Sequence, residues 1–195
     1  MRHDAYGYWI EEAGPVDPAP ALSGEREADV LVVGGGYTGL WTAWYLRQLE
    51  PGAKVVLLEA EEVCGRGPSG RNGGFCNAMW LSLPSLRSRW GDEAALAIGH
   101  AAERAVGRIA EFCESEALDA WFRPAGYLQV STATAHDGAW AAALEACREL
   151  GVPEAMTALS EEEVAERCAS PAFRAGAVCP SSATVQPARL ALGLR

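Results

Sequence analysis

The sequence has little that points to a metal site, a secretory signal or a membrane anchor. Its six cysteines lie at wide intervals with no Cys-x-x-Cys pair, and its three histidines do not cluster with them, so metal-ligand spacing is absent. A secretory signal requires an apolar stretch after its positively charged start, and no such stretch follows Arg2. No apolar run approaches the roughly 18 residues of a membrane span. We therefore expect a cytoplasmic protein with reduced thiols, no bound metal and no membrane partner.

Positive charge is also scarce. The chain of 195 residues has 16 Lys and Arg against 26 Asp and Glu, which gives a formal net charge of −10. This balance argues against a nucleic-acid partner or an anionic membrane surface. An acidic chain that binds an anionic cofactor must do so through backbone amides and a few local cations, and a glycine-rich loop provides such amides.

The most informative feature that is present is a strand, a glycine turn, a helix and a second strand in succession. Short continuous apolar runs at 29–33 and 54–58 are typical of parallel strands covered on both faces. Between them a helical pattern runs from Thr38 to about Leu49 and stops at Pro51-Gly52. Glu59 follows the second run. The order predicts an α/β, Rossmann-like domain with a parallel sheet.

The glycines of the turn have the spacing Gly-x-Gly-x-x-Gly at Gly34, Gly36 and Gly39. Gly34 permits the tight turn, Gly36 lets a pyrophosphate approach the backbone, and Gly39 lets the helix lie close to the sheet. The helix N-terminus, at Tyr37 and Thr38, offers unpaired N–H groups and about half a positive charge to the phosphates. We interpret this segment as a site for the adenosine diphosphate half of a dinucleotide. The alternative is a βαβ unit without a ligand.

An acidic residue stands where such a site needs a ribose acceptor. Glu59 falls about 20 residues after Gly39, at the carboxyl end of the second apolar run. Its carboxylate would accept hydrogen bonds from the adenosine ribose, each worth about 1.5–3 kcal/mol. The same charge would repel a 2′-phosphate, so the sequence disfavours NADP.

A second glycine-rich loop lies at 64–78 and contains Ser69, Gly70, Arg71, Asn72 and Gly73. Its glycines allow backbone amides to face an anion, and Arg71 has the charge to neutralise a phosphate. The alternative for Arg71 is a solvated loop arginine.

The rest of the chain alternates between helices and short strands. We expect an irregular, proline-bearing arm at 1–28 with an aromatic cluster at Tyr6, Tyr8 and Trp9. The later elements expected are a helix over 92–118, a strand at 126–130, a helix capped within 134–137 and ending at Gly151, a helix opened by the Ser160/Glu163 capping box, and a helix begun by Pro187. The expected domains are the arm at 1–28, a dinucleotide-binding βαβ region with a helical insertion at 29–118, and a partial substrate domain that returns toward the first domain at 119–195.

Three of these stretches, 29–59, 67–74 and 185–194, resemble the D-amino-acid-oxidase-like superfamily of FAD-dependent oxidoreductases. Within it the chain is most similar to the bacterial gamma-glutamylputrescine-oxidase-type branch. The likeness starts at about Tyr6 and covers only the N-terminal portion of the family's fold. The resemblance therefore implies a truncated chain that is inactive by itself.

The resemblance implies FAD as the cofactor. It assigns the pyrophosphate loop to Gly34, Gly36 and Gly39, the ribose acceptor to Glu59, and the loop along the inner edge of the flavin to residues 69–73. It implies oxidation of a small-molecule amine or amino acid, with hydride transfer to the flavin, hydrolysis of the imine and reoxidation by dioxygen. No catalytic residue is assigned. Cys64 and Cys76 flank the second loop, and we expect small buried cysteines there rather than flavin-reactive thiols.

Two other functions stay open. The first glycine motif alone also suits a nicotinamide-dependent dehydrogenase, although such an enzyme does not need the second glycine loop. The other alternative is a non-catalytic dinucleotide-binding fragment. The substrate and the oligomeric state do not follow from the sequence.

Overall fold

The computed structural model describes residues 7–195. These form two compact units, each built from segments that are distant in sequence. Unit 1 comprises the described residues up to Gly74 together with Cys113–Trp121 and Val185–Arg195, and unit 2 comprises Phe75–Phe112 and Phe122–Thr184. The predicted domain boundaries at 28/29 and 118/119 stay a prediction. Tyr6, one member of the predicted aromatic cluster, lies outside the described residues.

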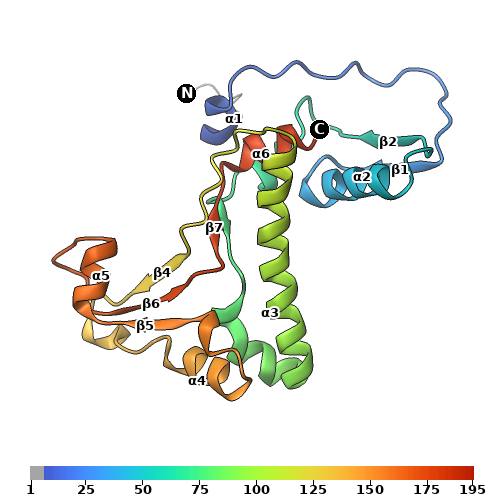
Figure 1. Ribbon diagram of the computed structural model, residues 1–195. Coiled ribbons are helices and arrows are strands. Elements are labelled where there is room, and N and C mark those ends of the chain that lie inside the picture. Colours follow the sequence, from blue (N-terminus) through green and yellow to red (C-terminus); the bar gives the residue numbers. More distant parts are fainter. Residues whose placement is uncertain (1–6) are drawn as a thin grey trace. The chain divides into compact units, whose positions relative to one another are not determined.

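In unit 1 the predicted strand–helix–strand order is confirmed. Strand β1 (Val30–Val33) pairs in parallel with β2 (Val55–Leu58), in the register Val30↔Val55 to Val33↔Leu58. Helix α2 (Tyr37–Leu49) connects the two strands and packs against them (Figure 1). Leu31 and Val33 of β1 are 56% and 79% exposed. Alternate residues of a strand point to opposite faces, so these two side chains share one sheet face, and that face carries apolar groups in the open.

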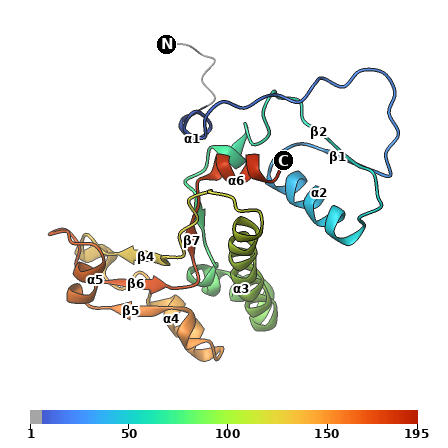
Figure 2. The ribbon, with the colours of Figure 1, turned by 45° about the horizontal axis from the view of Figure 1, so that its top comes forward.

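Unit 1 also contains two short helices that lie side by side in both ribbon views (Figure 2). Helix α6 (Pro187–Gly193) begins at Pro187, as predicted, and the Gln186 side chain caps it by accepting the Arg189 N–H. Helix α1 (Tyr8–Glu12) corrects the expectation of a wholly irregular arm. Its five residues form a helix because they are packed against other parts of unit 1, since a helix of one turn has little stability by itself.

The sheet of unit 2 is antiparallel. Strand β6 (Gly176–Cys179) lies between β4 (Tyr127–Val130) and β5 (Thr157–Leu159). A second pair joins β3 (Phe75–Cys76) to β7 (Ala183–Thr184). Only β4 was expected from the sequence, because the other strands are too short or too rich in small residues to show an alternating pattern.

The helices of unit 2 differ from expectation at their starts. Helix α3 (Leu83–Ser115) begins well before residue 92, because two helical segments meet at Gly91, whose φ of 82° breaks the helical geometry. Helix α4 (Ala141–Glu149) starts after the predicted cap at 134–137, which instead forms the 3-10 turn η3 (Thr134–His136). Helix α5 (Glu161–Arg167) has the predicted capping box. The remaining 3-10 turns are η1 (Pro68–Gly70) in unit 1 and η2 (Trp80–Ser82) and η4 (Pro153–Ala155) in unit 2.

The core of unit 2 forms between these helices and the sheet. Trp80 is 1% exposed and packs on Gly99 of α3, where an added methyl group would lie 2.3 Å from its ring. Other members of this core are Leu83, Leu86, Trp140, Cys147, Met156 and Ala177. Within residues 7–195, every helix is too short or too polar to cross a membrane.

Candidate functional site

The first glycine turn brings helix α2 into backbone contact with strand β1. Gly34 has a φ of +107°, a conformation that other residues rarely adopt. A methyl group at Gly39 would lie 1.9 Å from the Gly34 carbonyl oxygen and 3.2 Å from Val32 Cγ1. The third glycine therefore allows the close packing of helix and sheet for which such a motif selects glycine.

The N-terminus of α2 presents N–H groups at this turn. Gly36 is the N-cap residue, and its carbonyl accepts the Leu40 N–H at 2.9 Å. Within the described part of the chain, the N–H groups of Gly36 and Thr38 have no hydrogen-bond acceptor. The Tyr37 N–H donates to Ser69 Oγ at 2.9 Å. Unpaired N–H groups together with the helix dipole favour an anion at this position.

Glu59 follows β2 and is held by backbone donors. The Gly35 N–H donates to its Oε2 at 2.5 Å, and the Glu61 N–H donates to Oε1 at 3.0 Å. The Glu61 N–H, with a further contribution from Gly35, holds the pKa of the Glu59 carboxyl below its usual range. The carboxylate is thus ionised at neutral pH and oriented next to the glycine turn.

Gly35 is a further site residue, outside the Gly-x-Gly-x-x-Gly motif. Its N–H fixes Glu59, and a methyl group there would lie 2.7 Å from Cys64 Sγ and 2.9 Å from Glu59 Oε2. The run of three successive glycines at 34–36 was the available signal, because the motif explains only the first and the third.

The second glycine loop lies directly on the first, which the sequence alone did not show. Besides the bond from Tyr37 to Ser69, the Asn72 side chain donates to the Ser69 carbonyl at 2.8 Å and accepts the Gly74 N–H at 2.8 Å. Gly70 is buried, and a methyl group there would lie 2.3 Å from the Gly65 carbonyl oxygen. The bond from Tyr37 to Ser69 thus joins this loop to the start of α2, and the hydrogen bonds and close backbone contacts within the loop fix its shape.

Arg71 and Gly73 of the same loop are exposed. The Arg71 side chain passes Gly7, where an added methyl group would lie 3.9 Å from Arg71 Cγ and Nε. No ion pair of Arg71 is found within residues 7–195. Of the predicted residues, the structure therefore brings together those of the first loop with Glu59, Ser69, Gly70 and Asn72, and it leaves Arg71 and Gly73 on the surface.

The segment that contains α6 supports both loops from the other end of the sequence. The Tyr37 hydroxyl donates to the Pro187 carbonyl at 2.8 Å, and the Val185 N–H donates to the Gly74 carbonyl at 2.8 Å. A methyl group at Gly65 would lie 2.7 Å from Ala191 Cβ. The local pattern at Pro187 predicts the start of this helix but not its contact with the glycine loops.

A cavity of about 680 Å³ in unit 1 has Glu59 on its wall. Residues from the arm, α2, β2 and the two residues that follow α6 complete its lining, among them Leu22, Trp44, Leu57 and Arg195. This wall combines apolar surface with a few charged groups, a composition typical of small-molecule sites.

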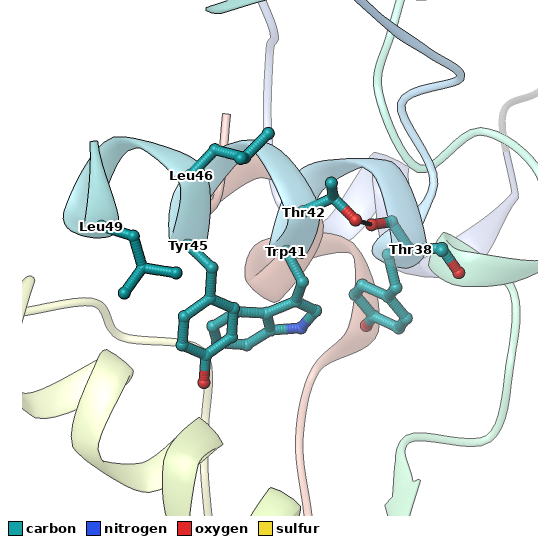
Figure 3. Close-up of a pocket in the computed structure, with 7 residues that line it drawn as sticks. Thr38, Trp41, Thr42, Tyr45, Leu46 and Leu49 are labelled. Atoms are coloured by element: carbon teal, nitrogen blue, oxygen red, sulfur yellow. Dashed lines mark hydrogen bonds between the residues drawn. The ribbon is translucent and has the colours of Figure 1, made fainter. Parts of the chain in front are cut away.

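A shallower hollow lies on the outer surface of α2 (Figure 3). Trp41 and Tyr45 form its floor with ring centroids 5.7 Å apart, and the Thr42 hydroxyl donates to the Thr38 carbonyl at 2.6 Å. The side chains of Tyr37 and Thr38 line this hollow. Its lining contains no charged residue.

The two cysteines that flank the second loop differ in burial. Cys64 is buried and Cys76 is half-buried. Burial, with a further contribution from the charge of Glu59, raises the pKa of the Cys64 thiol. A protonated, buried thiol is a poor nucleophile, which favours a packing role for Cys64.

Comparison with known proteins adds family membership to this geometry. Residues 29–195 match the DAO family, described as FAD-dependent oxidoreductase. The Probable oxidoreductase OrdL of Rhizobium meliloti (strain 1021) is 32% identical over 192 residues, which cover 96% of this chain and 44% of that protein. The Gamma-glutamylputrescine oxidoreductase of Escherichia coli (strain K12) is 34% identical over 127 residues, which cover 65% of this chain and 29% of that protein.

A solved structure shares the fold. Glycine oxidase from Geobacillus kaustophilus superposes with a TM-score of 0.65 at 23% sequence identity, over 86% of this chain and 43% of that one. The chain spans less than half the length of these relatives. The family match, the strand–helix–strand order and the two predicted glycine motifs all agree, and this chain belongs to the DAO family of FAD-dependent oxidoreductases.

Proposed function

We propose that unit 1 holds the adenosine diphosphate half of FAD and that the protein oxidises a small-molecule amine or amino acid. The observation that carries the proposal is the hydrogen bond from the Tyr37 N–H to Ser69 Oγ. This bond places the second glycine loop at the N-terminus of α2, where the pyrophosphate of a dinucleotide binds in Rossmann-like folds. A nicotinamide site would use the first loop and does not need the second.

The residues present fit this cofactor. The N–H groups of Gly36 and Thr38 would bind the pyrophosphate, because they lie at the N-terminus of a 13-residue helix and have no other acceptor in the described chain. Gly34 and Gly39 set the shape of this turn. Gly70 and Gly73 would allow close approach of the second loop, while Asn72 holds its shape and exposed Arg71 would offset phosphate charge.

Glu59 has the remaining capacity that a ribose acceptor requires. An ionised carboxylate has about four acceptor sites, and the backbone N–H groups of Gly35, Ala60 and Glu61 interact with it. The remaining capacity would accept a ribose hydroxyl. The neighbouring cavity of about 680 Å³ gives the adenosine a place to bind.

FAD, when bound, supplies the hydride acceptor for oxidation at a carbon next to nitrogen. The residues of this chain would bind and orient it, and none is assigned to proton transfer. A small amine or amino acid is proposed as the substrate because the relatives include proteins named gamma-glutamylputrescine oxidoreductase and glycine oxidase. Dioxygen is proposed as the final electron acceptor, by analogy with the oxidase named among these structures.

The test is the identity of the nucleotide that the protein retains. Purified protein should show absorption bands at about 370 and 450 nm, as expected of a bound flavin cofactor. Heat release and chromatography should yield FAD rather than FMN, because the adenosine half is what the proposed site binds. Retention of NAD without flavin would refute the proposal. The enzymatic half is tested in a protein that spans the full length of the relatives, where FAD retention without amine-dependent reduction of the flavin would refute it.

A further inference from the structure

We propose that the N-terminal helix α1 is a positioning element for the second glycine loop, and that Glu12 is the residue that fixes it there. The inference rests on the proposed binding of FAD. Helix α1 precedes the family match, which begins at residue 29, so membership of the family assigns it no role. All contacts involved lie within unit 1.

The apolar side of α1 packs against the loop. Ile10 is 3% exposed and forms a cluster with Val63 and Ala188. Its Cδ1 lies 3.5 Å from the position of a methyl group at Gly70. Gly7, directly before the helix, lies beside the Arg71 side chain. Helix α1 and the residue before it therefore contact the loop at Gly70 and Arg71.

The polar side of α1 is attached to helix α6. The Gln186 side chain, 1% exposed, donates to the Trp9 carbonyl and to Glu12 Oε2, each at 2.7 Å. Arg189 Nη2 donates to Glu12 Oε1 at 2.9 Å. The hydrogen bond from Gln186, together with Arg189, holds the pKa of Glu12 below its usual range. Glu12 therefore remains an ionised acceptor for two donors of α6 at neutral pH.

Arg189 is itself held in place from the opposite side. Its Nη1 lies 3.2 Å from Asp119 Oδ2, and its guanidinium stacks 4.6 Å above the Trp121 ring. Helix α6 also accepts the Tyr37 hydroxyl at the Pro187 carbonyl. Helix α1 is thus connected to Tyr37 in two ways. One series of contacts passes through α6 to the Tyr37 hydroxyl, and the other passes through Gly70 to Ser69, which accepts the Tyr37 N–H.

This arrangement has an energetic reason. A five-residue helix is unstable in water by itself, and a glycine-rich loop loses much conformational entropy when it is ordered. Docking of α1 compensates for both costs, because one contact surface orders the helix and the loop together. Without the attachment by Glu12, the loop would have to be ordered when FAD binds, and the affinity for FAD would fall.

The experiment compares Glu12→Ala and Glu12→Gln with a matched control, Glu11→Ala. Glu11 is on the same helix, is exposed, and forms no ion pair within the described residues. Two quantities are measured in the full chain, namely the dissociation constant of FAD by fluorescence quenching and the hydrogen exchange of residues 67–74 without FAD. We expect the Glu12→Ala dissociation constant to rise by about tenfold, the loss of one hydrogen bond to a charged group, with faster exchange at 67–74. Glu12→Gln should restore part of both, and Glu11→Ala should change neither.

The segments in which hydrogen exchange changes distinguish positioning of the loop from a general loss of stability. Exchange at β1 and β2 should be unaltered in Glu12→Ala, since the contacts of α1 described above are with α6 and the second loop. Equal FAD affinity in Glu12→Ala and the parent protein would overturn the inference alone. Faster exchange throughout unit 1 would also overturn it, because Glu12 would then serve global stability. Absence of FAD binding by the parent protein would overturn both this inference and the proposed function.

Discussion

Replacement of Gly39 by alanine tests the packing on which the proposed cofactor loop depends. In an exposed helix interior, glycine to alanine stabilises a protein by up to about 1 kcal/mol. At Gly39 the sign should be reversed. The added methyl group would lie 1.9 Å from the Gly34 carbonyl oxygen, whereas close carbon–oxygen contacts in proteins are about 3.3 Å. Helix and turn must therefore separate by roughly 1.4 Å, the difference between these distances.

The loss in the free energy of unfolding depends on whether the groups around the added methyl group can move. Overpacking a well-packed site costs about 1–3 kcal/mol, and this clash belongs in the upper part of that range because the opposing group is backbone and cannot change rotamer. Against the helix-propensity gain, the net loss in the free energy of unfolding is about 2 kcal/mol. Displacement of the Gly36 N–H should also weaken FAD binding, by about tenfold to a hundredfold if one hydrogen bond to a charged group is lost.

Urea denaturation and FAD titration provide the two measurements. Gly107→Ala is the matched control, because Gly107 lies inside helix α3 and a methyl group there meets nothing within 4 Å. It should raise stability by about 0.5–1 kcal/mol and leave FAD affinity unchanged. A Gly39→Ala protein as stable as the parent, with the parent's FAD affinity, would show that α2 and β1 are not in backbone contact.

Three further changes have expected outcomes. Gly36→Val should abolish FAD retention, measured by absorbance after gel filtration, because the side chain would fill the pyrophosphate position and collide with Ser69 Oγ, which already lies 3.1 Å from a methyl group at Gly36. Glu59→Gln should bind FAD more weakly but still detectably. Stronger loss of FAD in Glu59→Gln than in Gly36→Val would contradict the assigned roles. Ser69→Ala should remove the acceptor of the Tyr37 N–H and cost about 1 kcal/mol in urea denaturation, and an unchanged midpoint would count against this cap. Titration of Glu59 should not change the FAD affinity between pH 8 and 6. The affinity should fall only below pH 4.5, the usual pKa of this group, because the folded-state pKa is lowered and the carboxylate persists until the pH passes below it. A loss centred near pH 6 in isothermal titration would exclude this carboxylate as the acceptor.

The strand–helix–strand part of unit 1 was predictable because its elements depend on short stretches of sequence. The apolar runs of β1 and β2, the glycine spacing and the acidic residue after β2 have physical causes that act within about 30 residues. The start of α6 at Pro187 and the capping box at Ser160 were predictable for the same reason, since both depend on a few adjacent residues.

The remaining features depend on contacts that no local pattern contains. The sequence shows that Ser69 lies in a glycine-rich loop but not that its hydroxyl caps α2, 32 residues away. Helix α1 was missed because its order comes from Gln186 and Arg189, far along the chain. The break of α3 at Gly91 was read as a helix start, and the cap at 134–137 failed because Gly138, with a φ of +77°, turns the chain before α4 can begin.

The contact between Tyr37 and Pro187 has a consequence for biosynthesis. The two residues are 150 positions apart, so at about 5–20 residues per second a ribosome makes Pro187 roughly 8–30 s after Tyr37. During this interval the first glycine turn, with β1 and β2, has emerged without the helix that supports it, while Leu31 and Val33 already expose apolar side chains. The nascent chain is therefore most vulnerable to aggregation and proteolysis before α6 is made, and FAD supplied at that stage meets an unfinished site.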